Sequence, residues 1–226
     1  MEDIYNFCEG GKELNWEQLQ KKIVQCENCK RLREWCTSRK GENPKYKDQD
    51  YWSKPVPGFG DRNARLIIVG LAPGAHGANR TGRPFQGDIA GDLLFSSLLE
   101  KGFSDMRNVY ITNVVKCAPP QDKPKSEEYA NCRSFLESEL DLLSEKKVIL
   151  TLGENAFKKI TAIYRNKGAN TVGIKFIHGN SYDLGANFPI LKVSYHPSKR
   201  NIINKKLSKE KLNTIFNDIL FLLNKN

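Results

Sequence analysis

Hydrophobic and polar positions along the chain alternate between two patterns. Short, continuous apolar runs are typical of strands that are buried on both faces of a parallel sheet. Such runs lie at 65–71, 108–116, 147–153 and 189–195. We therefore expect a mostly parallel central sheet built from these segments.

Segments with helical periodicity separate these runs. The segments predicted as helices are 15–26, 88–101, 126–143, 154–164 and 208–223. Asn15 is the expected N-cap of the first helix, with Gln18 completing a capping box. Because strands alternate with helices, the sequence predicts an α/β fold, a three-layer α/β/α sandwich. We expect residues 1–226 to form a single domain, with 37–63 as a connecting loop.

The charge balance points to a polyanionic partner. The chain has 226 residues, with 36 Lys and Arg against 26 Asp and Glu, a net charge of +10 and a pI of about 9.3. Nucleic acid is the simplest such partner, and a generally basic, solvated surface is the alternative. The sequence has no apolar run long enough for a membrane span. Its polar N-terminus does not resemble a secretory signal, so we expect a cytoplasmic protein.

The glycine-rich stretch GLAPGAHGANRTGRPFQGD, at 70–88, follows the first predicted strand. Its nearest match to a P-loop is GANRTGRP, in which Pro84 supplies neither a hydroxyl for Mg²⁺ nor a backbone N–H for a phosphate. The Rossmann spacing of glycines also fails directly after the strand. The loop therefore does not predict a nucleotide cofactor. It falls at the carboxyl end of a strand, where ligands of such sheets bind.

Cysteines form a second candidate site. In an intracellular chain, the six cysteines are better interpreted as metal ligands or free thiols than as disulfides. A C-x2-C pair follows the first helix, and a second pair is separated by fourteen residues; these are Cys26, Cys29, Cys117 and Cys132. Four thiolates suit Zn²⁺ or a [4Fe–4S] cluster, and the spacing does not choose between them. Cys8 and Cys36 are left over; Cys36 is a rival ligand, and idle thiols are the remaining alternative.

The glycine-rich stretch, together with SYHPS at 194–198, resembles the uracil-DNA glycosylase superfamily. It looks most like the iron–sulfur branch called family 5, or type B, and the resemblance covers about 26–204. It implies a monofunctional, monomeric DNA repair enzyme that flips uracil out of DNA and hydrolyses its N-glycosidic bond, leaving an abasic site. The resemblance also favours a [4Fe–4S] cluster on the four cysteines, which would tie the N-terminal helical segment to the sheet.

The resemblance assigns roles in holding the base. Phe85 would stack on uracil, and ordinary core packing is the alternative. Asn113 would accept from uracil N3–H and donate to O4, since a carboxamide offers both functions on one edge; a turn asparagine is the alternative. Backbone N–H groups of Leu71 and Ala72 would meet uracil O2.

The chemical step would rest on two further residues. His196 would donate to O2 and stabilise the negative charge that develops there, whereas a structural histidine is the alternative. Asp88 would act on water or on the cationic sugar. Asp88 also stands where a helix N-cap is expected, and the two roles can coexist.

Two positions depart from other branches of the family. Ala72 stands where many members carry Asp, Asn or Glu, and alanine cannot activate water. This departure leaves open a catalytically inert, metal-bound nucleic-acid module of the same fold. Gly74 stands where the best-known branch carries Tyr, which suggests a roomier pocket that also takes deaminated purines such as hypoxanthine.

Basic residues near the motifs are candidate DNA contacts. The stretch KRNIINKKLSKEK, at 199–211, directly follows the histidine motif. We expect Lys199, Arg200, Arg80 and Arg83 to contact phosphates. For the stretch at 199–211, a solvated linker to the last helix is the alternative.

Overall fold

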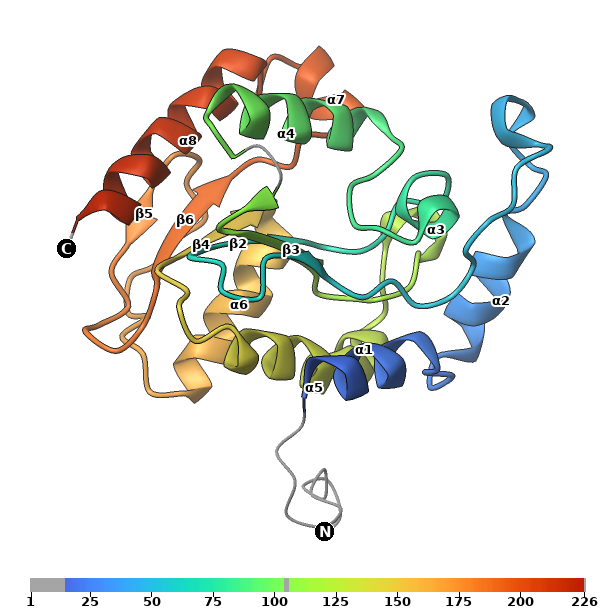
Figure 1. Ribbon diagram of the computed structural model, residues 1–226, viewed down its shortest axis with the longest axis horizontal. Coiled ribbons are helices and arrows are strands. Elements are labelled where there is room, and N and C mark those ends of the chain that lie inside the picture. The colour runs from blue at the N-terminus through green and yellow to red at the C-terminus, as the bar shows by residue number, and fades with distance from the viewer. Residues whose placement is uncertain (1–14, 104–105, 226) are drawn as a thin grey trace, which may run out of the picture.

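A computed structural model of the chain describes residues 15–103 and 106–225 (Figure 1). Cys8 lies outside these residues. The described part contains a sheet of six strands in the order β1-β3-β2-β4-β6-β5. The strands are β1 Phe59–Gly60, β2 Leu66–Gly70, β3 Val109–Asn113, β4 Val148–Leu152, β5 Ser181–Tyr182 and β6 Ile190–Ser194. The four inner strands run parallel and the two edge strands run antiparallel, so the mostly parallel sheet is confirmed.

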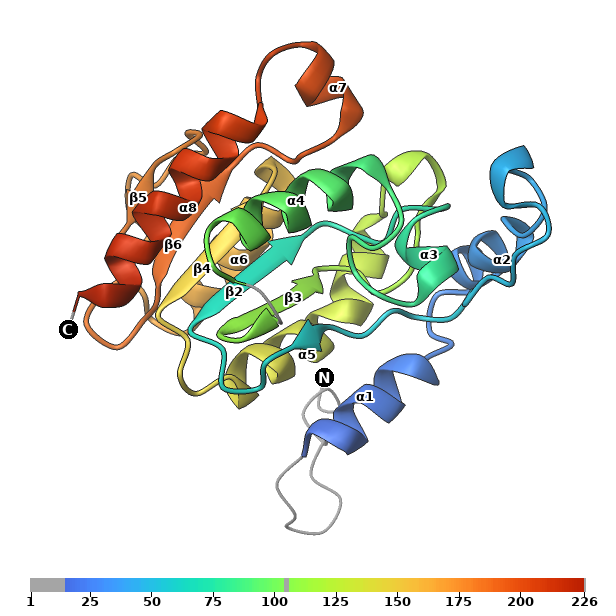
Figure 2. The ribbon, with the colours of Figure 1, turned by 45° about the horizontal axis from the view of Figure 1, so that its top comes forward.

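Helices cover both faces of the sheet (Figures 1 and 2). One face packs against α4 Ile89–Glu100 and α8 Lys209–Asn224. The other packs against α5 Ser126–Leu142 and α6 Glu154–Asn166, with α1 Trp16–Val24 lying on α5. Along β2, Leu66 and Ile68 face α4 and α8, while Ile67 and Val69 face α5 and α6. β2 is therefore apolar on both faces, and with helices covering both sides of the sheet the predicted three-layer α/β/α sandwich is confirmed.

Local capping explains where several predicted helices begin. The Asn15 side chain accepts from the Gln18 backbone N–H, and Gln18 accepts from the Asn15 N–H, which confirms the capping box. Asp88 caps α4 and Ser208 caps α8. No helix in the described ranges combines the length and apolarity that crossing a bilayer requires.

Shorter elements were not predicted from the sequence. They are α2 Lys30–Ser38, α3 Ala78–Thr81 and α7 Lys199–Ile203, the edge strands β1 and β5, and the 3₁₀ turns η1 Pro44–Tyr46 and η3 Pro120–Asp122. The expected connection at 37–63 contains the end of α2, η1 and β1. The basic stretch at 199–211 is only partly a linker, because α7 lies within it.

Candidate active site

A cavity of about 850 Å³ lies at the carboxyl ends of the parallel strands. The strand register places Gly70 beside Asn113 and Leu152 beside Ser194, so the segments that follow these strands meet at one edge of the sheet. The predicted residues that line this cavity are Leu71, Ala72, Phe85, Asp88, Asn113 and His196. The structure therefore brings every predicted base-binding and chemical residue into one place.

An aromatic pair forms one wall of the cavity. The rings of Phe85 and His196 stack with centroids 5.7 Å apart and planes 29° apart. Phe85 is buried and has a φ of 61°, in the left-handed region that a bulky residue rarely adopts. Its carbonyl lies against the first turn of α4, where a Cβ at Gly91 would come within 1.4 Å of the Phe85 oxygen. This close approach to α4 holds the strained backbone of Phe85 in place. Phe85 is therefore both a buried residue and part of the cavity wall.

Asn113 presents an unused acceptor. Its side chain is 1% exposed, and its Oδ1 has no hydrogen-bond partner among the described residues. A buried polar atom without a partner costs about 1–3 kcal/mol, so it is a favourable place for a ligand donor. Gly70 makes room for this amide, because a Cβ there would lie 2.4 Å from Asn113 Oδ1 and 2.6 Å from Phe85 Cζ.

His196 is desolvated but still reachable from the cavity. Burial lowers the pKa of its ring to about 4. Part of the ring surface stays open to the cavity, and within the described ranges neither ring nitrogen has a hydrogen-bond partner. Asn201 Nδ2, on α7, donates to the His196 carbonyl at 2.8 Å and holds its backbone. The ring is therefore neutral near pH 7 and can donate one N–H into the cavity.

Asp88 divides its carboxylate between two tasks. Oδ1 accepts from the Gly91 backbone N–H at 2.9 Å, which confirms the expected N-cap. Oδ2 faces the glycine-rich loop, where a Cβ at Gly77 or Gly74 would lie 2.3 or 3.0 Å away. Burial raises the pKa of Asp88, and the nearby Asp92 and Asp122 raise it further. A catalytic role for Asp88 stays a prediction.

Arg80 supports the wall of the cavity through contacts within the protein. Its Nε donates to the His76 carbonyl at 2.9 Å, its Nη2 to the Gly87 carbonyl at 3.1 Å, and its Nη1 to Gln49 Oε1 at 2.8 Å. The guanidinium also lies 4.0 Å from the centroid of the Tyr46 ring. Its role as a DNA contact stays a prediction, beside a structural role that the sequence did not indicate.

The remaining predicted DNA contacts lie on the surface. Arg83, Lys199 and Arg200 are exposed, and Lys199 lines the cavity at the start of α7. Sequence reasoning missed one part of the rim, which is formed by Asn43, Lys45 and Tyr46 in and beside η1. Nothing in the pattern of this polar segment indicates a site. The position of this segment beside the cavity depends on contacts to the glycine-rich loop. Tyr51 and Trp52 form hydrogen bonds with that loop, and Arg80 of the loop lies over the Tyr46 ring.

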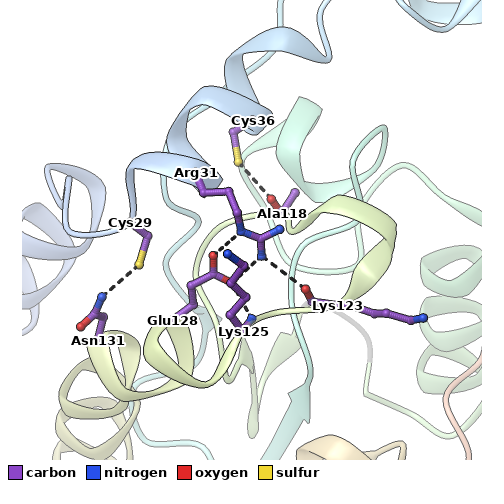
Figure 3. A network of polar contacts seen from close by, with 8 residues as sticks. All are labelled: Cys29, Arg31, Cys36, Ala118, Lys123, Lys125, Glu128 and Asn131. Carbon is purple, nitrogen blue, oxygen red and sulfur yellow. Dashed lines mark hydrogen bonds and ion pairs between the residues drawn. The ribbon is translucent and has the colours of Figure 1, made fainter.

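Two of the cysteines, Cys29 and Cys36, belong to α2 and its N-cap, and Cys29 faces Asn131 on α5 (Figure 3). Cys29 is the N-cap of α2, and Asn131 Nδ2 on α5 donates to its Sγ at 3.4 Å. Arg31 donates twice to Glu128 at 2.7 Å and so joins the same two helices. Burial raises the pKa of the Cys132 thiol to about 11, and its proximity to Cys29 and Cys26 raises it as well. Cys26, Cys29 and Cys132 are therefore electrostatic neighbours.

Cys117 lies near both Cys36 and Cys132. It shares a hydrogen bond with Cys36, which lowers the pKa of Cys36 and raises that of Cys117; the Cys36 Sγ also contacts the Ala118 carbonyl at 3.6 Å. Five thiols thus occupy one region, and soft sulfur donors fit zinc or an iron–sulfur cluster. Across 15–103 and 106–225, however, no three or more His, Cys, Asp or Glu side chains are placed to hold a metal ion.

Comparison with known proteins finds related sequences and a related fold. Residues 57–220 match the Uracil DNA glycosylase superfamily. The Type-5 uracil-DNA glycosylase of Thermus thermophilus is 40% identical over 199 residues, covering 83% of this chain and 89% of that protein. The Type-5 enzyme of Pyrobaculum aerophilum is 38% identical and covers 87% and 88% of the two chains. The crystal structure of Pedobacter heparinus SMUG2 matches with a TM-score of 0.51 at 16% identity, over 72% of this chain and 77% of that one, which supports the fold alone.

Proposed function

Because this chain belongs to the uracil DNA glycosylase superfamily, we propose that it removes uracil from DNA by hydrolysing the N-glycosidic bond and leaves an abasic site. The observation that carries the proposal is the convergence of Phe85, Asn113 and His196 in one cavity behind the strand ends. All three come from one chain, so we propose that a monomer suffices. A DNA substrate also implies that the enzyme works inside the cell.

The base would be held by complementary hydrogen bonds. A flipped uracil stacked on Phe85 would place its N3–H at the unused Asn113 Oδ1, while the Asn113 Nδ2 donates to O4. Backbone N–H groups of Leu71 and Ala72 would face O2, where charge develops as the bond breaks. The neutral His196 donates to the same oxygen, and donors placed in advance in a dry site act most strongly on such charge.

Water must attack the sugar without a carboxylate at position 72, where this chain has alanine. Asp88 is the carboxylate of the glycine-rich motif that lines the cavity, and its Oδ2 faces the glycine-rich loop while Oδ1 accepts from Gly91. We propose that this oxygen orients the water or stabilises the cationic sugar. Its raised pKa means that the charged form is lost at a higher pH than for an ordinary aspartate.

Asp88→Asn is expected to slow the single-turnover excision rate by a similar factor for every leaving base. Asparagine caps a helix nearly as well as aspartate, so α4 should keep its stability. The part of the acid decline in rate that comes from protonation of Asp88 should also disappear, whereas any decline from protonation of His196 near pH 4 should remain. Single-turnover rates measured across pH 4–8, together with thermal unfolding, test this. Full activity with normal folding would reduce Asp88 to a cap.

The experiment that tests the proposed function is release of free base from a uracil-containing oligonucleotide. Hypoxanthine-containing DNA and thymine mispairs belong in the same assay, because Gly74 carries no side chain where the best-known branch of the family has Tyr, and a Cβ there would lie 3.0 Å from Asp88 Oδ2. Binding of DNA with no base release would instead identify an inert nucleic-acid module.

We propose that a [4Fe–4S] cluster is held by Cys26, Cys29, Cys117 and Cys132. The donor chemistry and the shared region support it, since Cys117 and Cys132 are neighbours and Cys132 also lies near Cys26 and Cys29. When bound, the cluster supplies a cross-link rather than a reacting group. It joins α1, α2, β3 and α5, whose sequence separation makes closure of this loop entropically costly without it.

Protein purified without oxygen is expected to be brown, with a broad absorbance shoulder near about 400 nm from thiolate-to-iron charge transfer. Cys117→Ala should remove the colour and lower solubility. Cys36→Ala is the matched control and should keep the colour, since it removes a thiol from the same buried region. Metal analysis that finds one zinc in colourless protein would contradict the iron–sulfur assignment.

Reversing Lys199, Arg200, Lys205 and Lys206 to glutamate is expected to weaken binding to all DNA sequences and to flatten the salt dependence. Each phosphate contact releases counterions from the DNA when it forms. The slope of log K against log salt concentration should therefore fall in magnitude by about 0.9 for each contact that is lost. Reversal of Lys147 and Lys225, which are exposed away from the cavity, is the control. If the salt dependence of DNA binding changes equally per reversed charge in both variants, the DNA does not run along the basic stretch at 199–211.

A further inference from the structure

A fully buried ion pair lies directly beneath the candidate site. Lys116 Nζ and Glu139 Oε2 are 2.6 Å apart, and each side chain is 1% exposed. Lys116 follows β3 by three residues, and Glu139 lies on α5. Neither residue lines the cavity, and neither has a part in the proposed reaction.

Every polar group of this pair is used. The Lys116 ammonium donates to Glu139, to Thr112 Oγ1 at 2.7 Å and to the Asn113 carbonyl at 2.9 Å, which accounts for its three N–H bonds. Glu139 also accepts from the Gly58 backbone N–H at 3.0 Å, from the Tyr110 hydroxyl at 3.3 Å and from Thr112 Oγ1 at 2.7 Å. Burying two charges is unfavourable unless their geometry is this complete.

The contact to the Asn113 carbonyl connects this pair to the base-reading amide. Asn113 is the last residue of β3, so beyond it the backbone leaves the sheet. The next residue, Val114, donates its N–H to the Gly70 carbonyl at 3.0 Å, and Lys116 holds the Asn113 carbonyl from the other side. The amide of Asn113 itself has an unpartnered Oδ1 in the cavity, so its direction depends on this backbone.

We propose that the Lys116–Glu139 pair positions Asn113 for reading the base. This inference rests on the proposed function, because it takes Asn113 to bind uracil. A misplacement of about 1 Å costs an enzyme about a hundredfold in rate, so a device that fixes the end of β3 has a direct effect on chemistry. A purely structural pair would affect folding stability without acting through Asn113.

The test needs a variant that removes the charges without leaving one of them unpaired. Lys116→Met with Glu139→Gln is suited to this purpose. The carboxamide introduced at position 139 still accepts from Gly58 through its carbonyl, and its amide donates to Thr112, while the Asn113 carbonyl loses its donor. Replacing a buried pair by neutral groups of similar shape is often neutral for stability, whereas removing one partner is not. Thermal unfolding checks that the double variant is folded.

The measurement is a mutant cycle in single-turnover excision from uracil DNA. We expect the double variant to lose about tenfold to a hundredfold. Asn113→Ala should lose at least as much, and the combined triple variant should be no slower than Asn113→Ala alone, because residues that act through one group are not additive. Losses that multiply in the triple variant would overturn the inference.

A control is the ion pair between a second buried lysine and a half-exposed aspartate. Lys192 Nζ and Asp218 Oδ2 are 2.7 Å apart, with Lys192 2% and Asp218 49% exposed, and Lys192 lies on β6, three strands from the β3 strand that ends at Asn113. Lys192→Met with Asp218→Asn should change unfolding and leave the excision rate within about twofold. The same cycle is measured on binding of DNA with 2′-fluoro-2′-deoxyuridine, which resists cleavage. A wild-type protein that binds this DNA but releases no base from ordinary uracil DNA refutes the proposed function, and additive losses of affinity refute the inference.

Discussion

His196→Ala is expected to lower the single-turnover rate of uracil excision by about a hundredfold or more, while binding to uracil DNA barely changes. The ring stacks on Phe85 at the base of the cavity, and both of its nitrogens are without partners in the described part of the protein. It is therefore available to donate to uracil O2, where the charge of the leaving base develops. An interaction made mainly in the transition state lowers the rate and not the affinity.

The leaving base provides the control for this prediction. The loss should shrink for 5-fluorouracil, which departs more easily and needs less help at O2. His178→Ala is a matched variant, because His178 is half-buried against Tyr195 and does not line the cavity. Equal losses for both bases, or a loss in affinity alone, would contradict the assignment of His196 to the leaving group.

The pH dependence follows from the lowered pKa of His196. With a pKa of about 4 the ring is neutral above about pH 5, so His196 itself should cause no change in rate between pH 6 and 8. The unfolded chain binds a proton at about pH 6.5, before the folded chain does. His196 therefore lowers the free energy of unfolding as the pH falls from about 6.5 toward 4. Chemical denaturation of wild type and His196→Ala at pH 5 and 7 measures this difference.

Gly70→Ala is expected to lower the excision rate by about a hundredfold while the fold survives. Its added Cβ would lie 2.4 Å from Asn113 Oδ1 and 2.6 Å from Phe85 Cζ, so both site side chains must move. Overpacking of this kind costs about 1–3 kcal/mol of unfolding free energy, which a domain of this size tolerates. Single-turnover rates and thermal unfolding are measured together.

Gly168→Ala is the matched control for the crowding. A Cβ at Gly168 would meet nothing within 4 Å, although its φ of +88° adds backbone strain. This variant should lose some stability and keep the excision rate. A Gly70→Ala enzyme with normal activity would show that Phe85 and Asn113 need not keep their positions for the reaction.

Much of the fold follows from interactions between residues near one another in the sequence. Continuous apolar runs such as 66–70 have to be buried on both faces, and helices begin where Asn15, Asp88 and Ser208 cap their own backbones. Parallel strands bring their carboxyl ends to one edge, which indicated where a ligand would bind, and the resemblance of the motifs there to the uracil-DNA glycosylase superfamily pointed to the residues that line the cavity. For these features the sequence alone was sufficient.

Other features depend on contacts between distant segments, which only tertiary packing selects. The structural contacts of Arg80 to Gln49, His76 and Gly87 are of this kind, and the sequence did not indicate them. Asn43, Lys45 and Tyr46 reach the cavity because that same packing carries η1 across to it. The positions of Cys36 beside Cys117, and of Glu139 beneath Asn113, were decided in the same way. Local propensity acts over a few residues, whereas the partner of a buried charge or thiol is set by which helix covers which strand.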